Sequence, residues 1–149
     1  MNGIPRILIA EDDPLIAQLY RTTLTASGFI VEMAFDGEDV LTHLNKTKEL
    51  PDLLLLDLLM PKLNGFDVLQ QIKHNPALKN IPIVVLSNLT EWQNAEKALE
   101  LGASLYMVKS SYTPKEIAMK VKEVLAGQTN DNNSKFETKV STKDIPVSK

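Results

Sequence analysis

Cysteine is absent from the sequence of 149 residues, and this absence removes three kinds of chemistry. Without thiols the chain forms no disulfides, uses no cysteine nucleophile and offers no cysteine ligand to a metal. An excess of positive charge is lacking too, because 16 Lys and Arg residues stand against 19 Asp and Glu residues, giving a net charge of -3. Since phosphate backbones and anionic lipids are bound through clustered Lys and Arg, we expect no direct binding to nucleic acid and no attachment to a membrane.

Long hydrophobic runs are also missing. No apolar stretch approaches the roughly 20 residues that cross a bilayer, and residues 1–6 lack the charged and then apolar layout of a secretory signal. Together with the lack of cysteine, this favours a cytoplasmic protein. With 44% hydrophobic residues, the chain is long enough for one globular domain with a sizeable core and too short for two large ones.

The hydrophobic residues that are present form five short runs, separated by longer stretches with helical spacing. The runs are Ile7 to Ala10, Phe29 to Ala34, Leu53 to Leu56, Ile83 to Leu86 and Leu105 to Val108. Runs this short and this apolar predict strands that are buried on both faces. Strands that alternate with helices predict an α/β fold in which helices cover both faces of a parallel sheet.

Several helix ends are marked by capping residues. Asp13 followed by Pro14 predicts a helix N-cap, and Thr113 with Glu116 predicts a capping box at the last helix. The apolar residues that we expect on the buried face of the first helix are Leu15, Ile16, Leu19, Tyr20 and Leu24. The glycines that we expect to follow helices in a left-handed conformation are Gly28, Gly102 and Gly127.

The composition changes near the end of the sequence. From Gly127 to Lys149 it is dominated by Asn, Thr, Ser and Lys, with few large apolar residues. Such a segment buries too little surface to offset the entropy lost on ordering. We therefore predict one domain over residues 4–126 and a flexible polar tail over residues 127–149, with no second domain.

Polar residues follow four of the predicted strands. They are Glu11, Asp12 and Asp13 after the first strand, Asp57 after the third, Ser87 after the fourth and Lys109 after the fifth. The carboxyl ends of parallel strands share one edge of the sheet, and ligands bind in the crevice there. A single polar residue at a loop start is unremarkable, but four segments that deliver acids, a hydroxyl and an amine to one edge predict a functional site.

The acids at this edge predict a site for a divalent cation. Glu11, Asp12 and Asp57 would repel one another if crowded together, unless a cation lies between them. Mg²⁺ suits a ligand set made only of oxygens. We expect Asp13 to act as the helix cap instead, Lys109 to pair with Asp57, and the Ser87 hydroxyl to donate to an anion formed on Asp57.

With Met60, Pro61, Gly65 and Tyr106 in addition, the ordered set of residues resembles the receiver domain of two-component response regulators over residues 4–126. The resemblance implies a doubly wound, flavodoxin-like sheet of five parallel strands in the order 2-1-3-4-5. It implies that Asp57 accepts a phosphoryl group from a histidine kinase or a histidine phosphotransfer protein. The chain would then be a stand-alone response regulator that catalyses only its own phosphorylation and dephosphorylation, and otherwise not an enzyme.

The resemblance also implies a role for each remaining site residue. Mg²⁺ would be held by Asp12, Asp57 and the backbone carbonyl of Leu59, with Glu11 acting through water. Ser87 and Lys109 would bind the phosphoryl oxygens, and Tyr106 would rotate into the space that their movement releases. The face made by the fourth helix, the fifth strand and the fifth helix would contact a downstream protein target, with the receiver itself a monomer or a weak phosphorylation-dependent dimer.

Three positions depart from the family pattern. Ser110 follows Lys109 where this family usually has proline, often after a cis bond. Leu59 and Leu89, two residues past Asp57 and Ser87, are apolar where the family frequently has polar groups that orient an attacking water. We therefore hypothesise slow loss of the phosphoryl group.

Other functions fit the residues less well. An aspartyl-phosphate hydrolase needs a second acid two residues after its nucleophile, and Leu59 stands there. A flavin-binding domain would share the sheet, but acids in the first loop would repel its phosphate. The main alternative is a receiver-type binding module that acts without phosphorylation.

Overall fold

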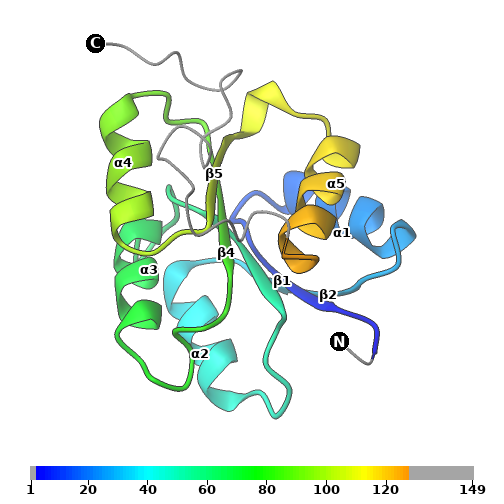
Figure 1. The fold of residues 1–149 in the computed structure, drawn as a ribbon, viewed down its shortest axis with the longest axis horizontal. Coiled ribbons are helices and arrows are strands. Elements are labelled where there is room, and N and C mark those ends of the chain that lie inside the picture. Colours follow the sequence, from blue (N-terminus) through cyan, green and yellow to red (C-terminus); the bar gives the residue numbers. More distant parts are fainter. Residues whose placement is uncertain (1–2, 128–149) are drawn as a thin grey trace.

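The structure, a computed structural model, describes residues 3–127 as five strands alternating with five α-helices (Figure 1). The strands are β1 Arg6–Ala10, β2 Ile30–Ala34, β3 Leu53–Asp57, β4 Ile83–Ser87 and β5 Leu105–Val108. The helices are α1 Pro14–Ala26, α2 Gly37–Lys46, α3 Gly65–Lys73, α4 Trp92–Glu100 and α5 Pro114–Leu125, with the 3-10 turn η1 at Lys109–Ser111. Except for Gly127, the predicted tail lies outside the described residues.

All strand pairs in the sheet are parallel, and the order is β2-β1-β3-β4-β5, as predicted. The register aligns the carboxyl ends of neighbouring strands, because Ala10 pairs with Leu56 and Asp57 pairs with Leu86. At the next step Ser87 pairs with Val108. The sheet therefore ends in one row of residues that carries the predicted polar groups.

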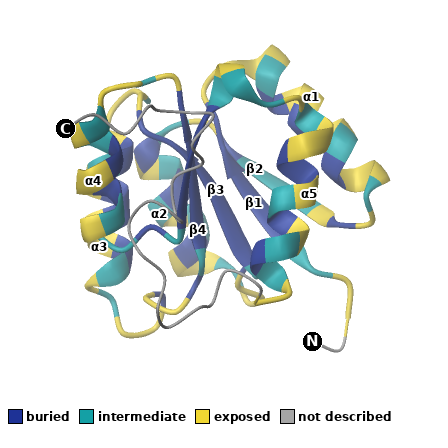
Figure 2. Ribbon diagram, turned by 45° about the horizontal axis from the view of Figure 1, so that its top comes forward, coloured by how far each residue is buried: buried dark blue, intermediate teal, exposed yellow. Residues whose placement is uncertain are grey.

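Helices cover both faces of the sheet, with α1 and α5 on one side and α2, α3 and α4 on the other (Figures 1 and 2). Leu53 and Leu55 of β3 belong to the core beneath α1 and α5, whereas Leu54 and Leu56 belong to the core on the opposite face. A strand enclosed on both faces has no solvent side. This explains why its sequence is continuously apolar rather than alternating.

The predicted helix ends are confirmed. Asp13 caps α1, because its Oδ1 accepts hydrogen bonds from the backbone N–H groups of Leu15 and Ile16 at 2.9 and 3.4 Å. Thr113 and Glu116 form the predicted capping box of α5. Gly28, Gly102 and Gly127 have φ angles of 101°, 114° and 77°, the left-handed conformation that follows a helix.

The predicted buried face of α1 is partly wrong. Tyr20 and Leu24 are buried, but Leu15 and Leu19 are 82% and 52% exposed. At 100° per residue, Leu15 and Leu19 lie on the side of the helix opposite to Ala17, Tyr20 and Leu24. The small residue Ala17 marks the true contact side and is fully packed.

None of the helices within residues 3–127 is long and apolar enough to span a bilayer.

Candidate functional site

The carboxyl edge of the sheet holds the buried polar side chains of the domain. Within the described residues these are Glu11, Asp57 and Ser87, at the ends of β1, β3 and β4. Asp57 and Ser87 are the last residues of their strands rather than the first residues of loops. Strand hydrogen bonds therefore hold their backbones, and this fixes the positions of the two Cα atoms from which the side chains extend.

Three carboxylates meet at this edge, as predicted. Glu11, Asp12 and Asp57 each offer an oxygen, and these oxygens all lie within 4.8 Å of one another. Glu11 and Asp57 are buried, while Asp12 is exposed, so the cluster opens to solvent on one side. A donor set of three carboxylates with no nitrogen or sulfur fits a hard divalent cation such as Mg²⁺.

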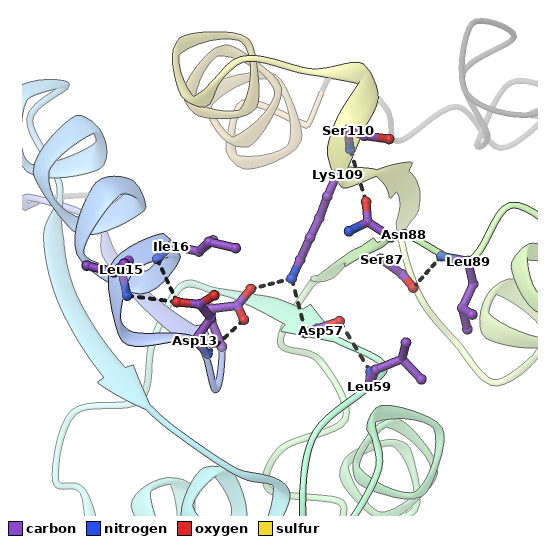
Figure 3. A network of polar contacts seen from close by, with 11 residues as sticks. Asp13, Leu15, Ile16, Asp57, Leu59, Ser87, Asn88, Leu89, Lys109 and Ser110 are labelled. Carbon is purple, nitrogen blue, oxygen red and sulfur yellow. Dashed lines mark hydrogen bonds and ion pairs between the residues drawn. The ribbon is translucent and has the colours of Figure 1, made fainter.

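Lys109 supplies the positive charge of the site. Its Nζ forms ion pairs with Glu11 Oε1 and, at 3.1 Å, with Asp57 Oδ2 (Figure 3). The three side chains are at most 11% exposed. The predicted pair of Lys109 with Asp57 is confirmed. The contact with Glu11 was not predicted, because it reaches across the sheet from the end of β5 to the end of β1.

Burial governs the protonation of these groups. It raises the pKa of Asp57 above its ordinary 3.8, and the charge and hydrogen bond of Lys109 offset this only in part. It raises the pKa of Glu11 above its ordinary 4.5 in the same way. Burial alone would lower the pKa of Lys109, but the hydrogen bond to Glu11 and the charges of Asp57 and Glu11 outweigh it, so this pKa is raised. The ammonium group pairs with two of the three clustered carboxylates, and a second cation would relieve the remaining excess of negative charge.

Leu59 lies beside the buried acid. Its backbone N–H donates to Asp57 Oδ1 at 3.2 Å, while its side chain is 57% exposed. The hydrogen bond fixes one carboxylate oxygen of Asp57 and leaves Oδ2 to Lys109. The apolar side chain thus stands at the rim of the site.

Two glycines hold the segment that carries Leu59. A Cβ atom on Gly65 would lie 2.4 Å from the Asp57 carbonyl oxygen, and one on Gly37 would lie 1.9 Å from the Leu63 carbonyl oxygen. The N–H of Gly37 also donates to the Pro61 carbonyl at 3.4 Å. The start of α2 and the segment between β3 and α3 therefore touch backbone to backbone. The sequence displayed both glycines, but the role of Gly37 was missed because its partner is distant in the chain.

Ser87 and Tyr106 are linked through Leu89. The Ser87 hydroxyl oxygen accepts a hydrogen bond from the Leu89 N–H at 3.1 Å, and the Tyr106 hydroxyl donates to the Leu89 carbonyl at 2.7 Å. Tyr106 is fully buried. Its ring thus already points inward in this structure, and its predicted rotation stays a prediction.

The segments after β4 and β5 are joined by a contact that was not predicted. The Ser110 N–H donates to Asn88 Oδ1 at 3.2 Å (Figure 3). The Lys109–Ser110 peptide bond is trans, like every other peptide bond within the described residues. An asparagine directly after Ser87 was the available signal, although nothing in the sequence identified its partner.

Comparison with known proteins agrees with this geometry. The family model for the response regulator receiver domain matches residues 7–122. A probable transcriptional regulator of Guillardia theta, ycf27, is 34% identical over 140 residues, which cover 94% of this chain and 52% of the relative. The DNA-binding response regulator MtrA of Mycolicibacterium smegmatis is 36% identical over 117 residues, covering 78% and 49%. The chain thus spans about half the length of these curated relatives.

Solved structures resemble the described fold over most of their length. The phosphorylated cyanobacterial phytochrome response regulator RcpA has a TM-score of 0.77 at 28% identity, covering 85% of this chain and 96% of RcpA. The Mn²⁺-bound form of response regulator Rcp1 has a TM-score of 0.72 at 29% identity, covering 80% and 92%. The chemotaxis response regulator CheY4 of Vibrio cholerae has a TM-score of 0.73 at 26% identity, covering 83% and 99%. Fold, site and sequence together show that this chain belongs to the response regulator receiver domain family of two-component systems.

Proposed function

We propose that Asp57 accepts a phosphoryl group from a phosphohistidine on a histidine kinase or a histidine phosphotransfer protein. The observation that carries the proposal is the meeting of Asp57 with two further carboxylates and the Lys109 ammonium at the sheet edge. In the transfer, a carboxylate oxygen of Asp57 bonds to phosphorus while the bond from phosphorus to the imidazole nitrogen breaks. The imidazole leaves with the electron pair of that bond.

The residues of the site support a role for Mg²⁺. Asp12, Asp57 and the backbone carbonyl of Leu59 would hold the ion, with Glu11 acting through water. The bound ion would neutralise charge on the phosphoryl oxygens. Two similar proteins add support, because Rcp1 is described in a Mn²⁺-bound form and RcpA in a phosphorylated form.

The remaining site residues bind and orient the phosphoryl group. Lys109 is paired with Asp57 Oδ2 at rest, and its ammonium would follow the negative charge onto a phosphoryl oxygen. Ser87 accepts a hydrogen bond from Leu89 N–H, which leaves its hydroxyl proton for another phosphoryl oxygen. Catalysis in this account consists of positioning and charge stabilisation, and the chain acts on no other substrate.

The signal would pass to a downstream protein through the face formed by α4, β5 and α5. The switch would run from Ser87 and Lys109 to Tyr106, whose hydroxyl holds the segment between β4 and α4. We propose a cytoplasmic receiver that makes no nucleic-acid contact of its own, as a monomer or a weak phosphorylation-dependent dimer. The name of MtrA describes DNA binding, but the match covers 49% of that protein.

The rim residues predict a long-lived phosphorylated form. Leu59 is exposed beside Asp57, and Leu89 is half-buried beside Ser87, so neither position offers a polar group to an attacking water. Leu59→Asn should shorten the half-life of the phosphorylated protein, followed by mass spectrometry over time. An unchanged or longer half-life would contradict the role of Leu59.

Incubation with Mg²⁺ and acetyl phosphate tests the proposal directly. Intact mass spectrometry should detect a gain of one phosphoryl group in the wild-type protein. The gain should be absent without Mg²⁺ and absent in Asp57→Asn. A wild-type protein that gains nothing, or an Asp57→Asn variant that still gains the group, would favour the phosphorylation-independent binding module instead.

A further inference from the structure

The Asn88 side chain joins the segments that directly follow β4 and β5, next to Ser87 and Lys109. Asn88 directly follows Ser87, Ser110 directly follows Lys109, and the Ser110 N–H donates to Asn88 Oδ1 at 3.2 Å (Figure 3). The pairing of β4 with β5 ends at Ser87 and Val108. The Asn88–Ser110 hydrogen bond therefore extends the connection between the two segments beyond the end of the sheet.

The donor in this link is a backbone group that has no partner inside its own turn. Lys109–Ser111 form the short 3-10 turn η1, and Val108 at its N-cap provides no side-chain cap. The first N–H groups of a helical turn lack intrahelical acceptors, and the amide oxygen of Asn88 supplies one. Proline at position 110 would have no N–H to donate. The link therefore depends on a residue other than proline following Lys109.

The position of Asn88 gives the link a consequence for the site. On one side of Asn88, Ser87 is fixed as the last residue of β4. On the other side, Leu89 is held by the Tyr106 hydroxyl through its carbonyl and by the Ser87 Oγ through its N–H. The Asn88–Ser110 hydrogen bond connects this segment to the residue after Lys109.

We propose that Asn88 is a positioning residue for phosphoryl binding, which sets the spacing between the Ser87 hydroxyl and the Lys109 ammonium before a phosphoryl group arrives. The inference rests on the proposed role of Asp57 as phosphoacceptor. Groups that are already ordered in the bound geometry bind more tightly, because less freedom is lost on binding. Asn88 touches no phosphoryl oxygen in this account and acts only through the segment after β5.

Asn88→Ala should affect three measurements differently. Hydrogen exchange at the Ser110 amide should become faster in the resting protein. Binding of beryllofluoride, a phosphoryl mimic, in the presence of Mg²⁺ should weaken about 2- to 10-fold, the effect of one neutral hydrogen bond. Affinity for Mg²⁺ alone should stay unchanged, because the carboxylates belong to the ends of β1 and β3.

Position 110 offers matched controls. Ser110→Ala keeps the backbone N–H and should bind beryllofluoride like the wild type. Ser110→Pro removes the N–H and should weaken binding as Asn88→Ala does. The double variant should be no weaker than the weaker single variant, because both substitutions remove the same hydrogen bond.

The outcomes distinguish the inference from the proposed function. Wild-type affinity for beryllofluoride in Asn88→Ala would overturn the positioning role, as would unchanged exchange at the Ser110 amide. A fully additive double variant would overturn it as well. A wild-type protein that binds no beryllofluoride with Mg²⁺ would overturn the proposed function and the role of Asn88 with it, while amide exchange would still report whether the link itself exists.

Discussion

The two edges of the sheet each carry ion pairs gathered around one basic residue, but the surroundings of the pairs differ. At the amino edge Arg6 pairs with Glu49 at 2.9 Å and Glu32 at 3.6 Å, with side chains between 28% and 60% exposed. At the carboxyl edge Lys109 pairs with Glu11 and Asp57, with side chains between 3% and 11% exposed. The same kinds of charge are therefore solvated at one edge and enclosed at the other.

Burial gives the two networks different physical roles. Solvent screens the Arg6 pairs, so they contribute little to stability. Removal from water raises the pKa of both Glu11 and Asp57. The nearby positive charge of Lys109 counteracts this effect. Enclosed charges respond strongly to a new cation or a new anion. Burial of these charges, rather than their number, thus distinguishes the carboxyl edge, where metal binding and phosphoryl transfer are proposed, from the amino edge.

The largest effect is expected from Lys109→Met. Without the ammonium group, Glu11 and Asp57 stay buried and unpaired, so the free energy of unfolding at neutral pH should fall by about 3 kcal/mol in urea denaturation without divalent cations. Added Mg²⁺ should restore part of the loss by binding the folded state. Lys120→Met removes a surface lysine paired with Glu123 and serves as the control. A loss of stability for Lys109→Met no larger than that of Lys120→Met would contradict the claim that burial makes the Lys109 pairs different from exposed pairs.

The next largest effect is expected from Gly37→Ala. The free energy of unfolding should fall by about 2 kcal/mol, because the new Cβ would overlap the backbone oxygen of Leu63. Since this moves the segment that carries Leu59, calorimetry should also show weaker binding of Mg²⁺. Gly102→Ala should destabilise the protein too, through its φ of +114° and the nearby Lys73 side chain, but it lies after α4 and should leave Mg²⁺ affinity unchanged. Equal Mg²⁺ affinities in the two variants would contradict this role of Gly37.

The pH dependence of the free energy of unfolding should report the burial of Asp57 and Glu11. An acid whose pKa is raised on folding holds more protons in the folded state than in the unfolded state, from its ordinary pKa up to the raised one. The stability linked to Asp57 and Glu11 should therefore fall as pH rises from their ordinary values of 3.8 and 4.5.

Asp57→Asn isolates this contribution when its urea denaturation is compared with that of the wild type. Its gain in stability over the wild type should widen as pH rises through that window. Ser87→Ala changes a buried polar residue that does not titrate there, so its difference from the wild type should stay constant. A constant difference for Asp57→Asn would count against a raised pKa.

The smallest effect is expected from Arg6→Met at the amino edge. Both of its carboxylate partners are in contact with solvent, so the free energy of unfolding should change by less than about 1 kcal/mol. Added salt should reduce the effect further. A change as large as that of Lys109→Met would show that burial does not separate the two networks.

Much of the carboxyl edge could be predicted because the needed information is local. Asp57 follows an uninterrupted apolar run, and parallel strands bring their ends to one edge, so its neighbourhood followed from the order of strands and helices. The strand order itself came with the family resemblance. The choice of Asp13 as cap and of Glu11 and Asp12 as site residues followed from Pro14, which marks the start of α1.

Contacts that depend on the path of two distant segments could not be predicted. The ion pair between Lys109 and Glu11 spans two intervening strands, β3 and β4. The Asn88–Ser110 hydrogen bond joins residues that are 22 positions apart. Leu15 and Leu19 were misassigned because leucine was taken as the mark of a buried face, whereas the small Ala17 occupies the contact side of α1. Side-chain volume at an interface is set by the partner helix, which the local pattern does not contain.

Calorimetric titration with Mg²⁺ tests most directly the claim that the three carboxylates gathered at the carboxyl edge form a cation site. The wild-type protein should bind one Mg²⁺, and Asp12→Asn should bind it at least 10-fold more weakly, as expected for a lost charged ligand. Because Asp12 is exposed, this variant should melt at or above the wild-type temperature without metal. Absence of Mg²⁺ binding in the wild type, or equal affinity in Asp12→Asn, would contradict the account.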